Sequence, residues 1–243
     1  MAVLLVSDLH LCPTRPGSTQ LFLSFLQRVA SQAEALYILG DLFEYWAGDD
    51  DLGEPFNASI AAALAALTAS GTRVFVLAGN RDFLLGPEFE QASGTTILPE
   101  PQFTTIAATP ALLLHGDSLC TNDKTYQAFC REVRSVDWRR AFLARPLAER
   151  HAEIEAMRVR SEEQKRSKPA AVMDVAEDAV AEMLRGHGYP PLMVHGHTHR
   201  PGQQQYVIDG HHCTRWTLGD WHHSGSYLCC NETGCRALPW PAQ

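Results

Sequence analysis

The sequence predicts an α/β fold in which short strands, buried on both faces, bring polar side chains to one edge of a sheet. Five short apolar runs carry this prediction, each of the length expected of a strand between turn residues. The runs span residues 3–6, 36–39, 74–78, 112–114 and 192–194. An aspartate, asparagine or histidine follows each run within two residues. Because ligands gather beyond the carboxyl ends of strands in open α/β sheets, we expect a functional site at that edge.

The first half of the chain adds a helix and two further strands. Residues 56–70 are rich in alanine and predict a helix that Gly71 ends, because glycine readily adopts the left-handed conformation common after a helix. Strands around residues 95–98 and 103–106 are enough to complete two stacked sheets.

The second half adds a helical segment and a hairpin. Residues 124–185 predict a helical insertion, because apolar side chains recur three or four positions apart among charged ones. Asp209-Gly210 predicts a hairpin turn between strands at residues 206–208 and 214–218. No internal repeat or Gly/Ser linker divides the chain, so we expect a single domain over residues 1–243, with the insertion at about 124–185.

The predicted strand ends offer a set of nitrogen and oxygen donors to metal ions. The set consists of Asp8, His10, Asp41, Asn80, His115, His195 and His197. A single histidine at a strand end is more often a hydrogen-bonded structural group than a ligand. Asp-x-His and His-x-His, however, place both side chains on one face of an extended segment. Seven donors exceed one tetrahedral site and predict two ions that share a carboxylate. Because no thiolate is among them, Mn, Fe and Zn are the candidate metals.

Glycine lies beside the donor in four of these loops, at Gly40, Gly79, Gly116 and Gly196. Glycine allows a tight turn and a close approach of backbone to an ion. The repeated association therefore strengthens the prediction of a metal centre.

Composition indicates an enzyme that is not exported. The chain has 243 residues, 45% of them hydrophobic, and a formal net charge of −8. No stretch reaches the roughly 18 to 20 apolar residues of a transmembrane helix, and the start has no basic signal-peptide region. The seven cysteines, with no Cys-x-x-Cys pair, predict reduced thiols in the cytoplasm. Cys229, Cys230 and Cys235 leave zinc open as an alternative, but small buried hydrophobic side chains are the better interpretation.

The insertion has a small net positive charge although the whole chain is acidic. Basic residues and hydroxyls cluster in residues 161–168, where they can clamp an anionic substrate over the acidic metal site. The alternative is an ordinary solvated helix face. Apolar side chains of the insertion can line an acyl-binding groove or only pack its helices together. These side chains are Tyr126, Phe129, Trp138, Phe142, Ile154 and Met157.

Five blocks of sequence, in order and spacing, resemble those of calcineurin-like metallophosphoesterases. They are Asp8-Leu9-His10, Gly40-Asp41, Gly79-Asn80-Arg81-Asp82, His115-Gly116-Asp117 and Gly196-His197-Thr198-His199. The resemblance implies a four-layer αββα sandwich in which the helical insertion forms a lid. Residues 40–46, 115–123 and 161–174 further resemble the lipid A branch of that superfamily, pyrophosphohydrolases that act on a UDP-linked, diacylated glucosamine.

That resemblance implies roles for individual residues. Two divalent ions, expected to be Mn²⁺, would be held by Asp8, His10, Asp41 and His197 on one side and by Asp41, Asn80, His115 and His195 on the other. Catalysis would rest on Asp41, Asn80, Arg81 and His115. The implied substrate contacts are Asn80, Arg81, Asp123, Ser161, Lys165, Lys168 and His195. We expect the protein at the cytoplasmic face of the inner membrane, where helices that carry arginine can rest on anionic lipid. We expect neither a nucleic-acid partner nor an obligate protein partner.

Arg81 bears on which phosphate bond is cleaved. Arginine does not give up its proton near neutral pH, but it pairs well with phosphate oxygens. A leaving group that is itself a phosphate needs charge neutralisation more than a proton, so Arg81 favours pyrophosphate cleavage. A structural pair between Arg81 and Asp82 is the alternative. A broader phosphodiesterase or nucleotide phosphatase, or a non-catalytic scaffold of the same superfamily, are the alternative functions.

Overall fold

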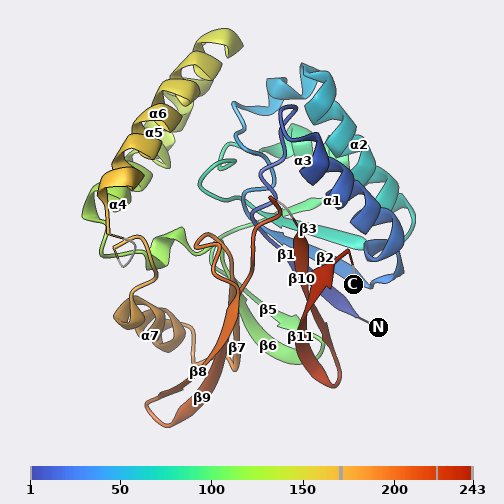
Figure 1. Ribbon diagram of the computed structural model, residues 1–243, viewed down its shortest axis with the longest axis vertical. Coiled ribbons are helices and arrows are strands. Elements are labelled where there is room, and N and C mark those ends of the chain that lie inside the picture. Colours follow the sequence, from blue (N-terminus) through green and yellow to red (C-terminus); the bar gives the residue numbers. More distant parts are fainter. Residues whose placement is uncertain (1, 170–171, 223, 242–243) are drawn as a thin grey trace.

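The computed structural model in Figure 1 describes residues 2–169, 172–222 and 224–241, without the side chains of residues 162 and 164–167. The described residues form two mixed sheets. The first sheet, in the order β11-β10-β1-β2-β3-β4, contains β1 (Val3–Val6), β2 (Ala35–Leu39), β3 (Arg73–Leu77), β4 (Thr96–Leu98), β10 (Gly225–Asn231) and β11 (Gly234–Trp240). The second, in the order β5-β6-β7-β9-β8, contains β5 (Gln102–Ile106), β6 (Thr109–Leu113), β7 (Leu192–His195), β8 (Gly202–Ile208) and β9 (His211–Thr217).

Helices occupy the connections between these strands. The α-helices are α1 (Pro16–Arg28), α2 (Pro55–Ala69), α3 (Pro87–Ser93), α4 (Lys124–Val133), α5 (Val136–Leu143), α6 (Leu147–Ser167) and α7 (Glu177–Gly186). Short 3₁₀ segments are η1 (Ala30–Gln32), η2 (Asp49–Gly53) and η3 (Asp117–Leu119). No helix in these described ranges is long and apolar enough to cross a bilayer.

The two sheets and their helices form four layers. Neighbouring side chains along a strand point to opposite faces, so a strand between two layers must be apolar throughout. In β1, Leu4 and Val6 pack with α1 and α2, whereas Val3 and Leu5 pack toward the second sheet. Side chains of β6 and β7 pack in turn against α7. This arrangement confirms the predicted αββα sandwich.

The helices α4, α5 and α6 lie beside the four layers (Figure 1), and Phe142 of α5 is buried in the same core cluster as Leu4 and Val6. In contrast, α7 covers the second sheet, with Val180 and Leu184 fully buried against it. The part that projects is therefore residues 124–167, while the segment predicted as an insertion extended to residue 185 and included α7.

The predicted helix end and hairpin turn have the expected backbone conformations. Gly71, two residues beyond α2, has φ +107°. Asp209 and Gly210 both have positive φ, 51° and 85°, between the antiparallel strands β8 and β9. Positive φ at both central residues is the pattern of a type I′ hairpin turn.

The prediction that the cysteines are reduced thiols is wrong for two of them. Cys230 and Cys235 are directly opposite in the β10–β11 pair and form a disulfide, with Cα atoms 4.0 Å apart. The register brings these two residues together, which their spacing along the chain did not show. Cys12, Cys120, Cys130 and Cys213 are free and buried, as expected of small hydrophobic side chains.

Candidate metal centre

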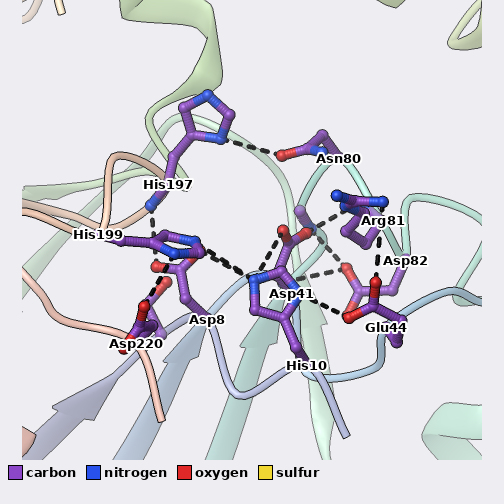
Figure 2. A network of polar contacts seen from close by, with 12 residues as sticks. Asp8, His10, Asp41, Glu44, Asn80, Arg81, Asp82, His197, His199 and Asp220 are labelled. Carbon is purple, nitrogen blue, oxygen red and sulfur yellow. Dashed lines mark hydrogen bonds and ion pairs between the residues drawn. The ribbon is translucent and has the colours of Figure 1, made fainter. Parts of the chain in front are cut away.

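The loops after β1, β2, β3, β6 and β7 meet at one edge of the sandwich. Backbone hydrogen bonds tie them together, since the amide of Asp8 donates to Gly40 O at 3.1 Å and that of Gly196 donates to His115 O at 2.9 Å. The side chains that these loops carry converge on one point, as Figure 2 shows for most of them. The side chains that the strand ends were predicted to bring together therefore lie at one edge, with the exception of His195.

The first half of the cluster combines two carboxylates with two imidazoles. His10 Nε2 lies 3.9 Å from Asp8 Oδ1 and 3.7 Å from Asp41 Oδ2. His199 Nε2 lies 3.3 Å from both Asp8 Oδ1 and His10 Nε2. Asp8 is fully buried and His10 nearly so. The ligating atoms of Asp8, His10 and His199 are close enough together to hold one ion.

The second half lies on the other side of Asp41. His115 Nε2 is 3.7 Å from Asp41 Oδ1 and 3.0 Å from Asn80 Oδ1. His197 Nδ1 is also 3.0 Å from Asn80 Oδ1. The two carboxylate oxygens of Asp41 thus face different histidines, Oδ2 toward His10 and Oδ1 toward His115. A carboxylate placed in this way can bridge two ions.

The backbone of the cluster is strained. Left-handed conformations are rare for residues other than glycine and cost about 1 kcal/mol or more each. Among the described residues with positive φ, several belong to the cluster: Asp8 (56°), His10 (48°), Asp41 (54°), His197 (68°) and His199 (54°). Strain of this kind persists where surrounding contacts fix a functional geometry.

Glycine makes the close approach of the loops possible. A Cβ atom on Gly79 would overlap Asp41 Oδ1, and one on Gly196 would overlap Asp8 Oδ2. A Cβ on Gly40, where φ is +89°, would overlap the ring of His115. The glycines beside the donors therefore make room for the donors themselves.

Asp82 joins the loops after β2 and β3. Its buried carboxylate accepts backbone N–H groups from Leu42 and Gly79, each at 2.7 Å, and from Asp41 and Phe43, each at 3.3 Å. Its oxygens are thus occupied by the backbone, which argues against the alternative of an Arg81–Asp82 pair.

The Arg81 side chain is turned toward Glu44 instead. Its Nη1 lies 3.9 Å from Glu44 Oε1, and its backbone N–H donates to Asp41 Oδ1 at 2.8 Å. Glu44 also pairs with Arg15 and Arg158. Arg81 therefore belongs to a charged network on the rim of the centre.

The pKa values of several side chains in the cluster are strongly shifted. Burial raises the pKa of Asp41 to about 7. Burial alone would lower the pKa values of His115 and His199, but neighbouring carboxylates outweigh it and raise them to about 9 and about 10. For His197 burial dominates and lowers the pKa to about 3. The pKa of each histidine therefore depends on whether burial or the neighbouring carboxylates have the larger effect.

One buried carboxylate oxygen of the cluster lacks a hydrogen-bond partner. Among the described residues, Asp8 Oδ1 is buried, faces the Nε2 atoms of His10 and His199, and has no hydrogen-bond partner. Unpaired buried polar atoms are costly unless something else satisfies them. A divalent cation satisfies a carboxylate oxygen directly, and the mixed carboxylate, amide and imidazole donors suit such an ion. The residues present therefore fit a metal.

His195, one of the predicted donors, is not brought into the cluster. It ends β7, and its Nε2 lies 3.3 Å from Thr217 Oγ1 on the neighbouring strand β9. Burial lowers its pKa to about 4. The physical reason for the difference is the left-handed turn at His197, which breaks the alternation that His-x-His spacing assumes. The histidine pair at the centre is instead His197 and His199.

Sequence reasoning missed three residues of this region. His199 lies in the quoted block Gly196-His197-Thr198-His199, so a second His-x-His pair was visible. Glu44 and Asp220 lie behind His10 and His199, and no spacing pattern pointed to them.

A small cavity of about 110 Å³ lies beside the cluster, and several predicted substrate contacts line it. They are Asn80, Arg81, Asp123, Ser161 and Lys168. Lys168 Nζ is 2.6 Å from Asp123 Oδ2. The predicted contact at Lys165 lies outside the described side chains.

A larger cavity of about 460 Å³ lies between the insertion and the loops of the first sheet. The apolar side chains predicted for an acyl groove all line it: Tyr126, Phe129, Trp138, Phe142, Ile154 and Met157. Trp46, Phe83 and Leu84 from the sandwich complete its apolar wall. These side chains therefore surround a cavity as well as pack together.

Fold and centre together define a metal-dependent phosphoesterase. A model of the calcineurin-like phosphoesterase family matches residues 1–201, most of the chain. The chain therefore belongs to this family, whose members use divalent metal ions. Among solved structures, a dimetal phosphatase from Danio rerio has a similar fold, with a TM-score of 0.52 at 13% identity and 99% of both chains covered.

Relatives that match along nearly their full length carry the name of one particular hydrolase. The chain is 51% identical to the UDP-2,3-diacylglucosamine hydrolase of Aromatoleum aromaticum, over 94% of this chain and 92% of that protein. It is 42% identical to the UDP-2,3-diacylglucosamine hydrolase of Cellvibrio japonicus, over 99% of each chain. The protein of that name from Pseudomonas aeruginosa is 44% identical, over 99% of this chain and all of that protein.

Proposed function

We propose that this protein hydrolyses the pyrophosphate bond of UDP-2,3-diacylglucosamine, releasing UMP and 2,3-diacylglucosamine 1-phosphate (lipid X), a step of lipid A biosynthesis. The names of the full-length relatives support the substrate. Family membership supports the class of reaction.

One observation carries the proposal within the structure itself. The cavity beside the metal centre and the apolar cavity share lining residues, namely Asn80, Arg81, Tyr126 and Ser161. A substrate that fills both cavities would place its phosphate groups at the metal centre and its apolar chains in the adjoining apolar cavity. A diacylated sugar linked to a diphosphate has this distribution of polar and apolar parts. A phosphodiesterase or nucleotide phosphatase that takes only polar substrates has no use for the apolar cavity.

We assign the donors to two divalent ions, with Mn²⁺ as the expected metal. Asp8, His10, Asp41 and His199 would hold one ion, and Asp41, Asn80, His115 and His197 the other. Two such ions, when bound, supply an activated water and neutralise charge on phosphate oxygens. His197 thus replaces His195 as the expected ligand of the second ion and as a substrate contact, and His199 replaces His197 as the expected ligand of the first ion.

The protein's own side chains bind and orient the diphosphate. Arg81 lies between the two cavities, where a guanidinium can pair with oxygens of the departing sugar phosphate. It neutralises that charge without giving up a proton, which suits a leaving group that is stable as an anion. Lys168, Ser161 and Asp123, together with Lys165 of the same segment, would bind the phosphosugar and nucleotide.

The insertion would act as a lid and as the point of contact with the inner membrane from the cytoplasmic side. Large apolar side chains are exposed on it: Phe129 (42%), Val136 (70%), Leu143 (41%) and Val159 (51%). Exposed apolar and basic side chains on the same helices favour an anionic lipid surface, from which a diacylated substrate must be taken.

Hydrolysis in ¹⁸O-labelled water tests the proposal. The purified protein, reconstituted with Mn²⁺, should convert UDP-2,3-diacylglucosamine to UMP, with the label in UMP and none in the sugar phosphate by mass spectrometry. Faster turnover of a chromogenic phosphodiester than of the lipid substrate would support a broader phosphodiesterase. Absence of any hydrolysis by protein that binds metal would favour the scaffold alternative.

A further inference from the structure

Asp220 contacts Nδ1 of His199, the ring nitrogen that is turned away from the metal centre. His199 Nδ1 lies 3.0 Å from Asp220 Oδ2, while His199 Nε2 lies 3.3 Å from Asp8 Oδ1. Figure 2 shows the imidazole of His199 next to the carboxylates of both Asp8 and Asp220. Nδ1 carries the proton that it donates to Asp220, so it is Nε2 that loses a proton and offers a lone pair to the centre when His199 becomes neutral.

Backbone hydrogen bonds hold the chain on both sides of Asp220. The amide of Leu218 donates to His195 O at 2.7 Å, and the amide of Trp221 donates to Asp8 O at 3.3 Å. Trp221 is fully buried, with its ring edge-on to Phe25. The backbone at Asp220 is therefore held in place by its neighbours, although its own side chain is 33% exposed.

The two halves of the centre differ in what stands behind their histidines. In the first half, Asp220 Oδ2 lies 3.0 Å from His199 Nδ1, within hydrogen-bond distance, whereas Glu44 Oε2 lies 3.5 Å from His10 Nδ1 and forms no hydrogen bond with it. In the second half His115 Nδ1 faces the backbone carbonyl of Leu39 at 2.9 Å. A carboxylate partner fixes the tautomer and raises the basicity of a metal-binding imidazole more than a carbonyl does.

We propose that Asp220 is a positioning residue which orients His199 and makes the half of the centre formed by Asp8, His10 and His199 the tighter of the two metal sites. The inference rests on the proposed metal centre but not on the proposed substrate. Glu44 lies near His10 Nδ1 without a hydrogen bond and also pairs with Arg15, Arg81 and Arg158, so its replacement would disturb the rim as well. Asp220 is the cleaner position to test.

Binding of Mn²⁺ alone to the metal-free full-length protein, followed by the electron paramagnetic resonance signal of free Mn²⁺, provides the test. Wild-type protein should bind one ion more tightly than the other. Asp220→Ala should weaken the tighter ion by roughly ten- to a hundredfold and leave the weaker one unchanged. Asp220→Asn should have a smaller effect, because its side-chain oxygen can still accept from Nδ1–H.

Asp209→Asn is a matched control. Asp209 also accepts hydrogen bonds from neighbouring side chains, Arg185 and Tyr189, but it lies in the β8–β9 turn away from the centre. This variant should bind both ions as the wild type does. Thermal unfolding of all the proteins in chelator should give equal midpoints, whereas a merely structural role for Asp220 would lower the midpoint of its variants.

Two equal Mn²⁺ sites in the wild type, or unchanged binding in both Asp220 variants, would overturn the inference. Weakening confined to the weaker ion would overturn it too. Wild-type protein that binds no Mn²⁺ would remove the metal centre on which the inference depends. Normal Mn²⁺ binding without hydrolysis of the lipid substrate would contradict only the proposed function.

Discussion

Lys168 Nζ lies 2.6 Å from Asp123 Oδ2, and the two residues stand at the two ends of the projecting helices α4–α6. Asp123 precedes α4 and caps it, accepting a hydrogen bond from the amide of Tyr126 at 3.0 Å. Lys168 directly follows α6. The pair therefore closes the base of the insertion beside the metal centre, where an anionic substrate can compete with Asp123 for the lysine.

Replacing Lys168 with alanine should mainly raise KM for the UDP-lipid. A ground-state contact to the substrate is lost, and charge-assisted hydrogen bonds are worth about 1.5 to 3 kcal/mol, or roughly ten- to a hundredfold. Steady-state kinetics measure the change. Arg140→Ala is the control, because Arg140 is an exposed basic residue of the same insertion, paired with Asp137 at 3.6 Å. Equal KM values in the two variants would show that Lys168 only belongs to a solvated helix face.

Replacing Arg81 with alanine should mainly lower kcat, by roughly ten- to a hundredfold. The guanidinium meets charge that grows on the leaving phosphate, so its contact strengthens in the transition state. The backbone N–H of residue 81 remains to donate to Asp41, and metal content should stay unchanged. A rise in KM at constant kcat would place Arg81 among the ground-state contacts instead.

The strand ends and the donor loops were predictable because burial on both faces leaves a plain sequence signal. Leu4 and Leu5 pack into different layers, and both must be apolar. The precise ligand set was less predictable, since it depends on backbone conformation. The left-handed turn at His197 directs His197 and His199 to the centre and leaves His195 against Thr217.

Other features depended on contacts that no local pattern encodes. Asp220 reaches His199 from a loop that is held by the burial of Trp221, and Cys230 meets Cys235 through the register of β10 and β11. Helix α1 and strand β11 were not predicted, although they contribute Phe25 and Trp240 to the core. Such contacts depend on how strands and loops are placed against one another, and they become visible only in the folded structure.

Replacing Asp41 with alanine should remove nearly all activity and lower metal content. Its two oxygens face the two halves of the centre, so both ions lose a ligand at once. Elemental analysis of the dialysed protein measures the loss, with Asp137→Ala, a change at an exposed carboxylate on α5, as the control. Unchanged metal together with a near-normal rate would refute a bridging role.

Metal affinity should rise with pH between about 6 and 8. Metal ligands must be deprotonated, and in the metal-free protein the pKa values of Asp41 and His115 are raised to about 7 and about 9. An incoming ion therefore displaces protons, and each displaced proton changes the affinity by about tenfold per pH unit. Calorimetric titration with Mn²⁺ at several pH values measures the slope. A flat profile would mean that the ligands are already deprotonated at pH 6.

Replacing Arg134 with methionine should destabilise the fold in a way that depends on pH. Arg134 Nη2 lies 2.9 Å from the Oδ2 of Asp117, which is completely buried. Removing the arginine leaves an unpaired buried carboxylate, at a cost of about 3 kcal/mol at pH 7.

The sign of the pH dependence follows from Asp117. Burial alone would raise its pKa, but Arg134, His115 and His197 together outweigh burial and lower the pKa from 3.8 to about 2, with Arg134 as the largest of the three. The pair thus stabilises wild-type protein fully above about pH 4, and this contribution is lost as the pH falls toward 2. Urea unfolding of both proteins should therefore show a difference in unfolding free energy that narrows over this range. Adding Asp117→Asn to the methionine variant should recover part of the loss at pH 7, since no charge is then left buried. A difference that stays constant with pH, or a double variant no more stable than Arg134→Met, would show that packing of the arginine and not its charge supports α4.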